Sequence, residues 1–314
     1  MRRSLPLAVA TLVLAVSACS SGDDDAAGAT TTVAAVSADP MTTIAVPDPS
    51  DECEDEPDPA ALVDGRAPQV FRPCTVPTEL VVHPIRPGAG RMAAVGDRII
   101  ADFTGIRAED GTIFDSSYLR GVPIDVLLGD PAGVQGWNQG LVGARAGAVL
   151  KLDVPSDLAY GETPPGEVLQ PGDAVSFVVE VRVVVPLVTE ADAPLDIQIE
   201  PSIGATEVST QDLTLGDGPV VELGKTAVVH MLLVRGDNQV VVFDSWTRND
   251  PLQIIMQNGA TLPGILEGLQ GATVGTLRSI IVPPDRGFGP AGEPSLGLPA
   301  DTDLIVIVDV IGVY

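Results

Sequence analysis

Histidine, cysteine and lysine are all rare in this chain. Its 314 residues include 2 histidines and 3 cysteines, and lysine occurs only at positions 151 and 225. Zinc sites are built mainly from cysteine and histidine, and the chain has no Cys-x-x-Cys pair. Nucleophilic enzymes usually need an activated side chain beside a base such as histidine. We therefore expect no metal and no cofactor, and the composition is awkward for a hydrolase.

Basic residues are also few. The chain has 17 lysines and arginines against 43 aspartates and glutamates, which gives a formal net charge of −26. A surface of this sign repels nucleic-acid phosphates and anionic headgroups. Nucleic acid is thus excluded as a partner, and contact with a membrane would have to come through a lipid anchor.

No hydrophobic run is long enough to span a bilayer. The apolar run from Leu5 to Val16 follows two arginines and is too short for a membrane helix. Small residues precede Cys19, which resembles a bacterial lipoprotein signal in which residues 1–18 are removed and Cys19 is lipidated. The alternative is an ordinary secretory signal with an incidental cysteine. We expect an exported protein, anchored by lipid to the outer face of the bacterial cell membrane.

Residues 19–77 are interpreted as a disordered acidic tether followed by an extension. No lysine or arginine lies between Arg3 and Arg66, so this stretch is strongly acidic. Calcium binding by residues 51–58 is the alternative, although no calcium-loop signature is present. Cys53 and Cys74 are expected to form a disulfide in an exported chain, worth about 3 kcal/mol in chain entropy. Two free thiols are the alternative.

One constellation of residues occurs twice. The offset between the copies is 128 or 129 residues, which indicates a duplicated domain rather than a solenoid. We expect domain one at 78–186, a linker at 187–207 and domain two at 208–314. The paired motifs are Phe114-Asp115-Ser116 with Phe243-Asp244-Ser245, Gly136 and Gly140 with Gly264 and Gly268, and Tyr160-Gly161 with Phe288-Gly289.

Apolar and β-branched runs predict the strands, and a helical spacing of apolar residues predicts one short helix per domain. Each domain is therefore expected to be α+β, an antiparallel sheet with a short helix. Order should begin near residue 80, with helices near 134–141 and 262–269. The predicted strands are 98–103, 123–128, 149–155, 175–185, 226–234, 240–243, 252–256, 276–282 and 303–313.

Several motifs of domain one, taken in order, resemble the FKBP-type peptidyl-prolyl cis-trans isomerases. The resemblance covers roughly residues 79–185, and residues 208–314 resemble the same family more weakly. It implies two FKBP-like domains, each a curved antiparallel sheet wrapped around a short helix, with the substrate pocket between sheet and helix. The motifs are Gly96-Asp97, Phe103-Thr104-Gly105, Asp110-Gly111, Phe114 to Ser117, Gly136-Trp137, Ala159-Tyr160-Gly161 and the run from Val175 to Val181.

The resemblance also implies which residues form the pocket. Trp137 would be its floor, and the remaining catalytic positions would be Phe103, Phe114, Asp115, Tyr160 and Phe177. Substrate contacts would come from Arg120, Ile124, Val134, Val168 and Leu169. Without the resemblance, this aromatic cluster would be interpreted as core packing.

Isomerisation suits these residue types. Rotation about a peptide bond meets a barrier of about 18–20 kcal/mol because resonance must be broken. The twisted transition state is less polar than the planar amide, so an apolar pocket favours it and needs no nucleophile or metal. Proline-containing polypeptides would be the clients, and macrolides that bind this family would be candidate ligands.

The second copy lacks most of the aromatic positions. Met231, Ile265, Phe288 and Ile305 are expected to replace Phe103, Trp137, Tyr160 and Phe177. Domain two is therefore expected to be weakly active or inactive, and to bind clients or pack against domain one. Arg248 would stand in for Arg120, and Trp246 would be either a contact anchor or a local packing residue. The alternative function is a chaperone or binding lipoprotein that uses both domains without catalysis.

Overall fold

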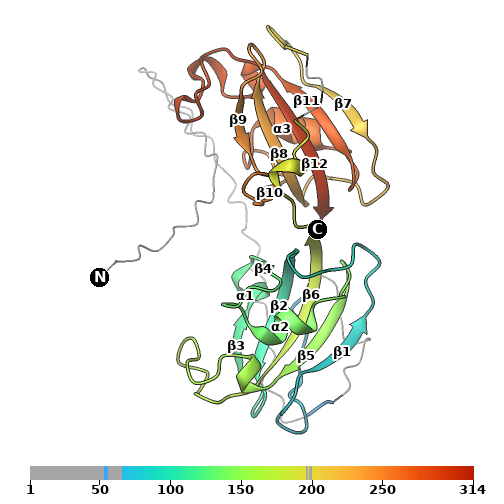
Figure 1. The fold of residues 1–314 in the computed structure, drawn as a ribbon, viewed down its shortest axis with the longest axis vertical. Helices are drawn as coiled ribbons and strands as arrows, with labels where there is room; N and C mark the ends of the chain where they lie inside the picture. Colours follow the sequence, from blue (N-terminus) through green and yellow to red (C-terminus); the bar gives the residue numbers. More distant parts are fainter. Residues whose placement is uncertain (1–52, 56–65, 196, 198–199) are drawn as a thin grey trace, which may run out of the picture.

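The computed structural model describes residues 53–55, 66–195, 197 and 200–314. The signal segment, Cys19 and most of the acidic tether lie outside these residues. Two bodies stand one above the other, and the carboxyl terminus lies between them (Figure 1).

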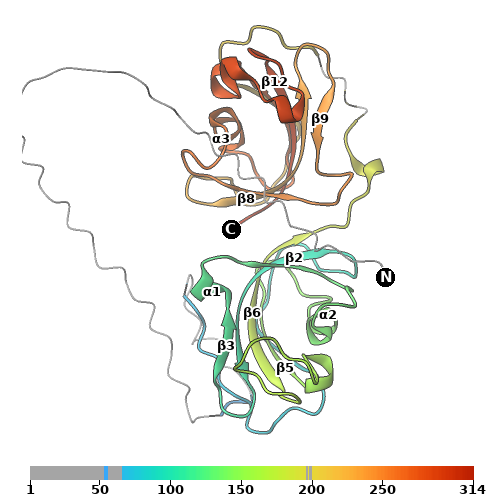
Figure 2. The same ribbon diagram turned by 90° about the vertical axis from the view of Figure 1, so that its left-hand side faces the viewer.

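Domain one is a six-stranded antiparallel sheet with two short helices. The sheet order is β1-β5-β6-β2-β3, and β4 pairs with the other end of β2. Helix α2 lies against the concave side of the curved sheet (Figure 2). The elements are β1 (Val81–Arg86), β2 (Arg98–Arg107), β3 (Ile113–Ser116), α1 (Ser117–Arg120), β4 (Ile124–Leu127), α2 (Gln135–Gly140), β5 (Val149–Val154) and β6 (Val175–Val185).

Domain two repeats this topology. Its order is β10-β8-β12-β11-β7, with β9 paired to β8, so each strand has a counterpart in domain one. The predicted α+β fold and its duplication are therefore confirmed. The elements are β7 (Ser209–Thr214), β8 (Thr226–Arg235), β9 (Val241–Asp244), β10 (Leu252–Ile255), α3 (Pro263–Leu269), β11 (Leu277–Val282) and β12 (Leu304–Val313).

Four of the strands and α-helices were not predicted: α1, β1, β3 and β7. Strand β7 is polar along its length and mostly exposed, so it carries no apolar alternation. It is nevertheless a strand because β11 supplies hydrogen-bond partners along its edge. Strand β3 and helix α1 are only four residues each, too short for a periodic signal.

The paired glycines of the repeat allow each helix to lie directly on the sheet. A Cβ atom on Gly136 would lie 2.4 Å from Val154 Cγ1, and one on Gly264 would lie 2.3 Å from Val282 Cγ1. Real Cβ atoms do not approach so closely, so the backbones can touch only where there is no side chain. The glycines repeated between the domains are therefore explained by helix packing rather than by chemistry.

A serine that follows the third strand has the same structural role in both domains, and here the counterpart of Ser245 is Ser117 rather than Ser116. Ser117 Oγ accepts a hydrogen bond of 2.9 Å from the backbone nitrogen of Phe103. Ser245 Oγ accepts the matching bond of 2.8 Å from Met231. In both domains this hydroxyl ties the end of the third strand to the long central strand.

The two domains meet through the ends of their central strands. A buried cluster joins Ile100, Val183 and Val185 of domain one to Val228 of domain two, with Tyr314 packed beside it. Gly312 approaches Val183 so closely that an added Cβ would lie 2.4 Å from Val183 Cγ1. The carboxyl-terminal strand thus contributes to the contact between the domains.

The linker packs against the outer face of the sheet in domain two. Val188, Ala193 and Ile197 contact a cluster that contains Trp246. Trp246 is only 3 % exposed and stacks on the buried His230 ring, with 5.1 Å between centroids. Of the two interpretations of Trp246, local packing is the one that the structure shows.

The extension before domain one is attached by a disulfide and by a buried lysine. Cys53 and Cys74 are bonded, as expected. Lys151 is 1 % exposed, and its Nζ donates a hydrogen bond of 2.6 Å to the carbonyl of Glu54. The extension therefore covers a charged group of β5, and ordered structure begins earlier than residue 80.

Candidate active site

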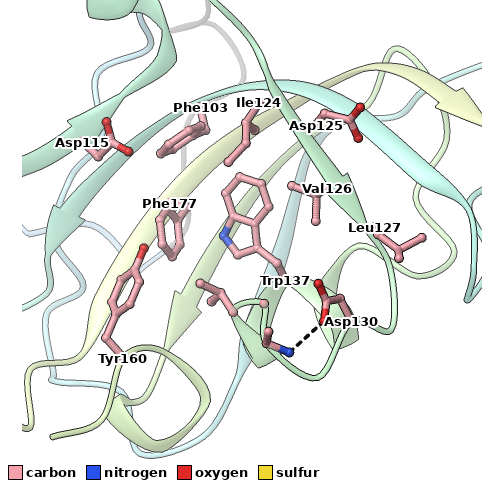
Figure 3. A pocket seen from close by; sticks show the side chains of 13 residues that line it. Phe103, Asp115, Ile124, Asp125, Val126, Leu127, Asp130, Trp137, Tyr160 and Phe177 are labelled. Carbon is pink, nitrogen blue, oxygen red and sulfur yellow. Dashed lines mark hydrogen bonds between the residues drawn. The ribbon is translucent and has the colours of Figure 1, made fainter. Parts of the chain in front are cut away.

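A cavity of about 300 Å³ opens between α2, β4 and the concave face of the sheet in domain one (Figure 3). Seven of the predicted site residues line it: Phe103, Asp115, Ile124, Val134, Trp137, Tyr160 and Phe177. These seven residues come from four strands, one helix and two loops, and the fold brings them together around one cavity.

Trp137 lies at the centre of the aromatic packing. Its ring is 5.3 Å from Phe103 and 5.3 Å from Phe177, both in edge-to-face geometry. Such pairs contribute about 0.5–1.5 kcal/mol beyond area burial, which holds the rings in place. Trp137 Nε1 is buried and has no hydrogen-bond partner among the described residues, so it is available to a ligand.

Phe114 supports the wall from behind. It does not line the cavity, but its ring is 5.9 Å from Tyr160 and 5.7 Å from Phe177. Gly105 makes this packing possible, because a Cβ there would lie 2.8 Å from Phe114 and 2.9 Å from Phe177. The glycine of the Phe103-Thr104-Gly105 motif thus provides space for two aromatic rings.

Tyr160 brings a hydroxyl group to the cavity. Burial raises the pKa of Tyr160, and the nearby Asp115 carboxylate raises that pKa further. The phenol therefore stays protonated at neutral pH and can donate to a carbonyl oxygen of a ligand.

Asp115 and Arg120 form an ion pair at the rim. The Arg120 guanidinium also lies over the Phe103 ring, 5.5 Å from its centroid. Arg120 itself does not line the cavity, and its contact with substrate stays a prediction.

The loop that carries Val168 and Leu169 places neither side chain in the cavity. Val168 is exposed, whereas Leu169 is 3 % exposed and belongs to the core, and neither lines the cavity. The loop is attached through Asp173, which accepts hydrogen bonds from Arg107 Nε at 2.8 Å and Gln170 N at 2.7 Å.

Asp173→Asn should reduce the stability of domain one by about 2 kcal/mol at pH 7, the typical value for a hydrogen bond to a charged group. The Arg107 hydrogen bond lowers the pKa of Asp173. A lowered folded-state pKa means that this stability is present above about pH 4 and is lost as the pH falls through that folded-state value. Urea unfolding at several pH values measures both effects.

Asp157→Asn is the matched control, because Asp157 is exposed and makes no ion pair among the described residues. It should change stability little at any pH. A difference between wild type and Asp173→Asn that stays constant down to pH 3 would contradict the assigned role.

Several cavity residues were missed from the sequence. They are Asp125, Val126, Leu127, Asp130, Ala132 and Gly133, from β4 and the turn before α2. Strand alternation could have suggested Val126, which points to the same side as Ile124. No sequence signal placed the turn residues, because their position depends on how that turn folds back over the cavity.

Domain two replaces several of the residues that line or support the cavity of domain one. In sheet register, Gly105 faces Phe177 and Leu233 faces Val306. The counterpart of Phe177 is therefore Val306, and the expected Ile305 was wrong by one residue because Ile305 belongs to the cluster on the outer face. Leu233, which replaces Gly105, is 3 % exposed and occupies the concave core together with Ile265.

The rim of domain two also differs. Asp244 accepts hydrogen bonds from the backbone of Trp246 and Thr247, so it caps a turn. Arg248 lies over the Phe243 ring at 5.0 Å, as Arg120 lies over Phe103. The two arginines thus stack on rings at different positions, because the counterpart of Phe103 is Met231. No Asp244–Arg248 ion pair forms among the described residues.

The described residues contain no group of three or more histidine, cysteine or acidic side chains arranged to hold a metal ion. No helix among them has the length and apolarity to cross a membrane.

Comparison with known proteins identifies the family. A model of the FKBP-type peptidyl-prolyl cis-trans isomerases matches residues 90–182 and 218–311, one match in each domain. The mouse protein named peptidyl-prolyl cis-trans isomerase FKBP10 is 31% identical over 238 residues, which are 76% of this chain and 37% of that one. This chain thus spans little more than a third of that relative.

Two bacterial proteins are similar over one domain. The FK506-binding protein of Neisseria meningitidis is 36% identical over 101 residues, 32% of this chain and 92% of that protein. The crystal structure of FkpA from Escherichia coli is 31% identical, with a TM-score of 0.31, and the match covers 34% of this chain and 48% of that one. On the two family matches, this chain belongs to the FKBP-type peptidyl-prolyl cis-trans isomerases.

Proposed function

We propose that domain one catalyses cis–trans isomerisation of X–Pro bonds in polypeptide clients. The observation that carries this proposal is the open aromatic cavity over Trp137, set against the aliphatic residues Ile265, Leu233 and Val306 at the corresponding positions of domain two. The proline ring would lie over the Trp137 indole, beside the wall that Phe103 and Phe177 form. Aromatic faces hold such a ring without polar complementarity.

The pocket would act by excluding water and by holding the client in place. An uncatalysed X–Pro bond takes tens of seconds to isomerise. In an apolar cavity the twisted amide, which has lost resonance, is favoured relative to the planar amide. The Tyr160 hydroxyl would donate to a client carbonyl and fix the chain on one side while the bond rotates. No side chain needs to transfer a proton.

Domain two is proposed to be weakly active or inactive, and to bind clients or hold domain one. Leu233 and Val306 replace a glycine and a phenylalanine, and Ile265 replaces the tryptophan floor. Apolar exchanges of this kind preserve a core while they remove a shaped cavity. The close packing of Gly312 on Val183 supports a role for domain two in holding domain one.

We further propose that the clients are exported or cell-envelope proteins. The support is the signal-like run before Cys19, together with a disulfide, which is typical of exported proteins. A lipid on Cys19 would anchor the protein at the outer face of the membrane, and the acidic tether would hold the domains away from it.

Phe177→Val tests the catalytic proposal by placing the domain-two residue into domain one. Phe177 is 1 % exposed and packs on Trp137 and Phe103, so its loss opens the wall of the cavity. We expect the catalysed rate of a proline-limited refolding reaction to fall about tenfold, equivalent to about 1.4 kcal/mol. The full chain is used, with thermal unfolding to confirm that domain one remains folded.

Val306→Ile is the matched change in domain two and should leave the rate near wild type. No acceleration of refolding by the unaltered chain would overturn the proposal. If the same chain then suppressed aggregation of unfolded clients, the non-catalytic chaperone function would replace it.

A further inference from the structure

The rim of the cavity in domain one is acidic. Asp115, Asp125 and Asp130 are among its 13 lining residues, and no lysine, arginine or histidine is. The floor is apolar, so the charged groups lie where the flanking residues of a bound client would pass. The residues that flank the proline of a bound client would therefore lie near carboxylates of domain one.

The three carboxylates differ in whether a cationic side chain neutralises their charge. Asp115 is paired with Arg120, and Asp125 accepts a hydrogen bond of 3.0 Å from Arg98 Nε. Asp130 has no cationic partner among the described residues. Its Oδ1 accepts one hydrogen bond of 2.9 Å, from the backbone of Ala132. Asp130 is thus the rim charge that remains open to a ligand.

The backbone of Asp130 is held firmly. Asn138 Nδ2 donates a hydrogen bond of 2.7 Å to its carbonyl, and Asn138 also accepts one from Gly129 N at 2.9 Å. Helix α2, which carries Trp137, therefore positions the turn that carries Asp130. The carboxylate has a defined place relative to the floor of the cavity.

The acidic groups lie on both sides of that floor. Asp115 lies beyond Phe103 on one side of Trp137, and Asp125 and Asp130 lie on the other (Figure 3). A client whose proline rests on Trp137 must pass one of these groups on each side.

We propose that domain one selects X–Pro segments that carry a lysine or arginine within about three residues of the proline, and that Asp130 is the main residue that determines this preference. The inference rests on the proposed isomerase function. Three extended residues span roughly 10 Å. That is slightly longer than the Debye length of about 8 Å at physiological salt, so the preference should be strongest for a charge one or two residues from the proline.

The net charge of the chain acts in the same direction. An excess of 26 negative charges attracts cationic segments and speeds their encounter with the site. This general attraction would respond equally to a change at any exposed carboxylate. A specific role of Asp130 would not, and the difference makes the inference testable.

The experiment compares three peptides that share one X–Pro core and differ only in the flanking residue, which is lysine, leucine or glutamate. Exchange measured by nuclear magnetic resonance on the full chain gives kcat/KM for each. We expect the order lysine, leucine, glutamate. Asp130→Asn should reduce the lysine-to-glutamate ratio about threefold, as expected for one partly exposed charge pair.

Two features of the design separate charge from structure. Asparagine retains the carbonyl oxygen that accepts the Ala132 hydrogen bond, so the turn should persist. Glu79→Gln removes the same charge at an exposed position outside the cavity, just before β1 at the opposite edge of the sheet, and should leave the ratio unchanged. Added salt should reduce the ratio in wild type more than in Asp130→Asn.

Each outcome has one meaning. A lysine-to-glutamate ratio near one, with normal turnover of the leucine peptide, would overturn the inference and leave the proposed function standing. An equal fall in the ratio for Asp130→Asn and Glu79→Gln would overturn the assignment to Asp130. Absence of turnover with every peptide would overturn the proposed function and this inference with it.

Discussion

Trp137→Ile should lower the prolyl isomerase kcat/KM of the chain by about 10- to 100-fold. The change places the residue of domain two, Ile265, at the floor of domain one. It removes a ring that packs edge-on against Phe103 and Phe177 at 5.3 Å each. Loss of one large apolar contact surface is worth about 1.5–3 kcal/mol, which corresponds to this range of rates.

The effect should appear mainly in catalysis. Isoleucine is apolar and smaller than tryptophan, so domain one loses contacts but buries no unpaired polar group. It also removes the indole nitrogen that has no partner in the empty pocket. Catalysed exchange in an X–Pro peptide measures the rate, and urea unfolding measures the stability of the same sample.

Ile265→Leu is the control. Ile265 occupies the equivalent position in α3, is 2 % exposed and packs in the core of domain two. The variant should retain the wild-type rate. A Trp137→Ile protein that keeps more than half of the wild-type rate would contradict the placement of catalysis over this floor.

Asp153→Ala should destabilise domain one by about 3–5 kcal/mol, because it leaves a buried cation without its counterion. Asp153 is 3 % exposed, and its Oδ2 lies 3.4 Å from Lys151 Nζ. The other oxygen accepts a hydrogen bond of 2.5 Å from Ser176 Oγ. Lys151 would keep only its bond to the Glu54 carbonyl.

The double variant Lys151→Met with Asp153→Val provides the contrast. Removal of both partners eliminates the unpaired charge and fills the space with apolar atoms, so most of the stability should return. Urea unfolding of the single and double variants is the measurement. A double variant as unstable as Asp153→Ala would show that the loss does not arise from the buried charge.

The internal repeat made domain organisation readable from the sequence. Gly136 and Gly264 had to recur because each helix touches the sheet where no Cβ fits. Because only glycine satisfies this steric requirement, glycine occurs at the corresponding position of both domains, 128 residues apart. The core strands were predictable for a related reason, since β6 and β12 are buried over most of their length and are therefore apolar almost throughout.

The edge strand β7 and the exact position of one wall residue in domain two could not be predicted from the sequence in this way. Strand β7 is polar, and only pairing with β11 makes it a strand. The position of Phe177's counterpart was misjudged by one residue, because a shift in loop length between the copies is visible only in strand register. A one-residue error in a strand places the side chain on the opposite face.

The candidate site contains residues that could be assigned before the structure was known and one that could not. Trp137, Phe103 and Phe177 could be assigned to a pocket only through the family resemblance, because the sequence pattern alone would have given core packing. The open position of Asp130 could not, since the chain contains 43 acidic residues that look alike in sequence.

The sequence by itself determined the duplication, the α+β class, the family resemblance and the aromatic residues of one pocket, because close packing allows few residue types at those positions. Only the tertiary structure decided that Gly105 makes room for Phe114 and Phe177 in domain one, where domain two places Leu233. It also decided that Lys151 is buried beneath the disulfide-bonded extension, and that Asp130 stands unpaired beside Trp137. These features depend on which side chains from distant segments meet, and that is set by the folded geometry rather than by local pattern.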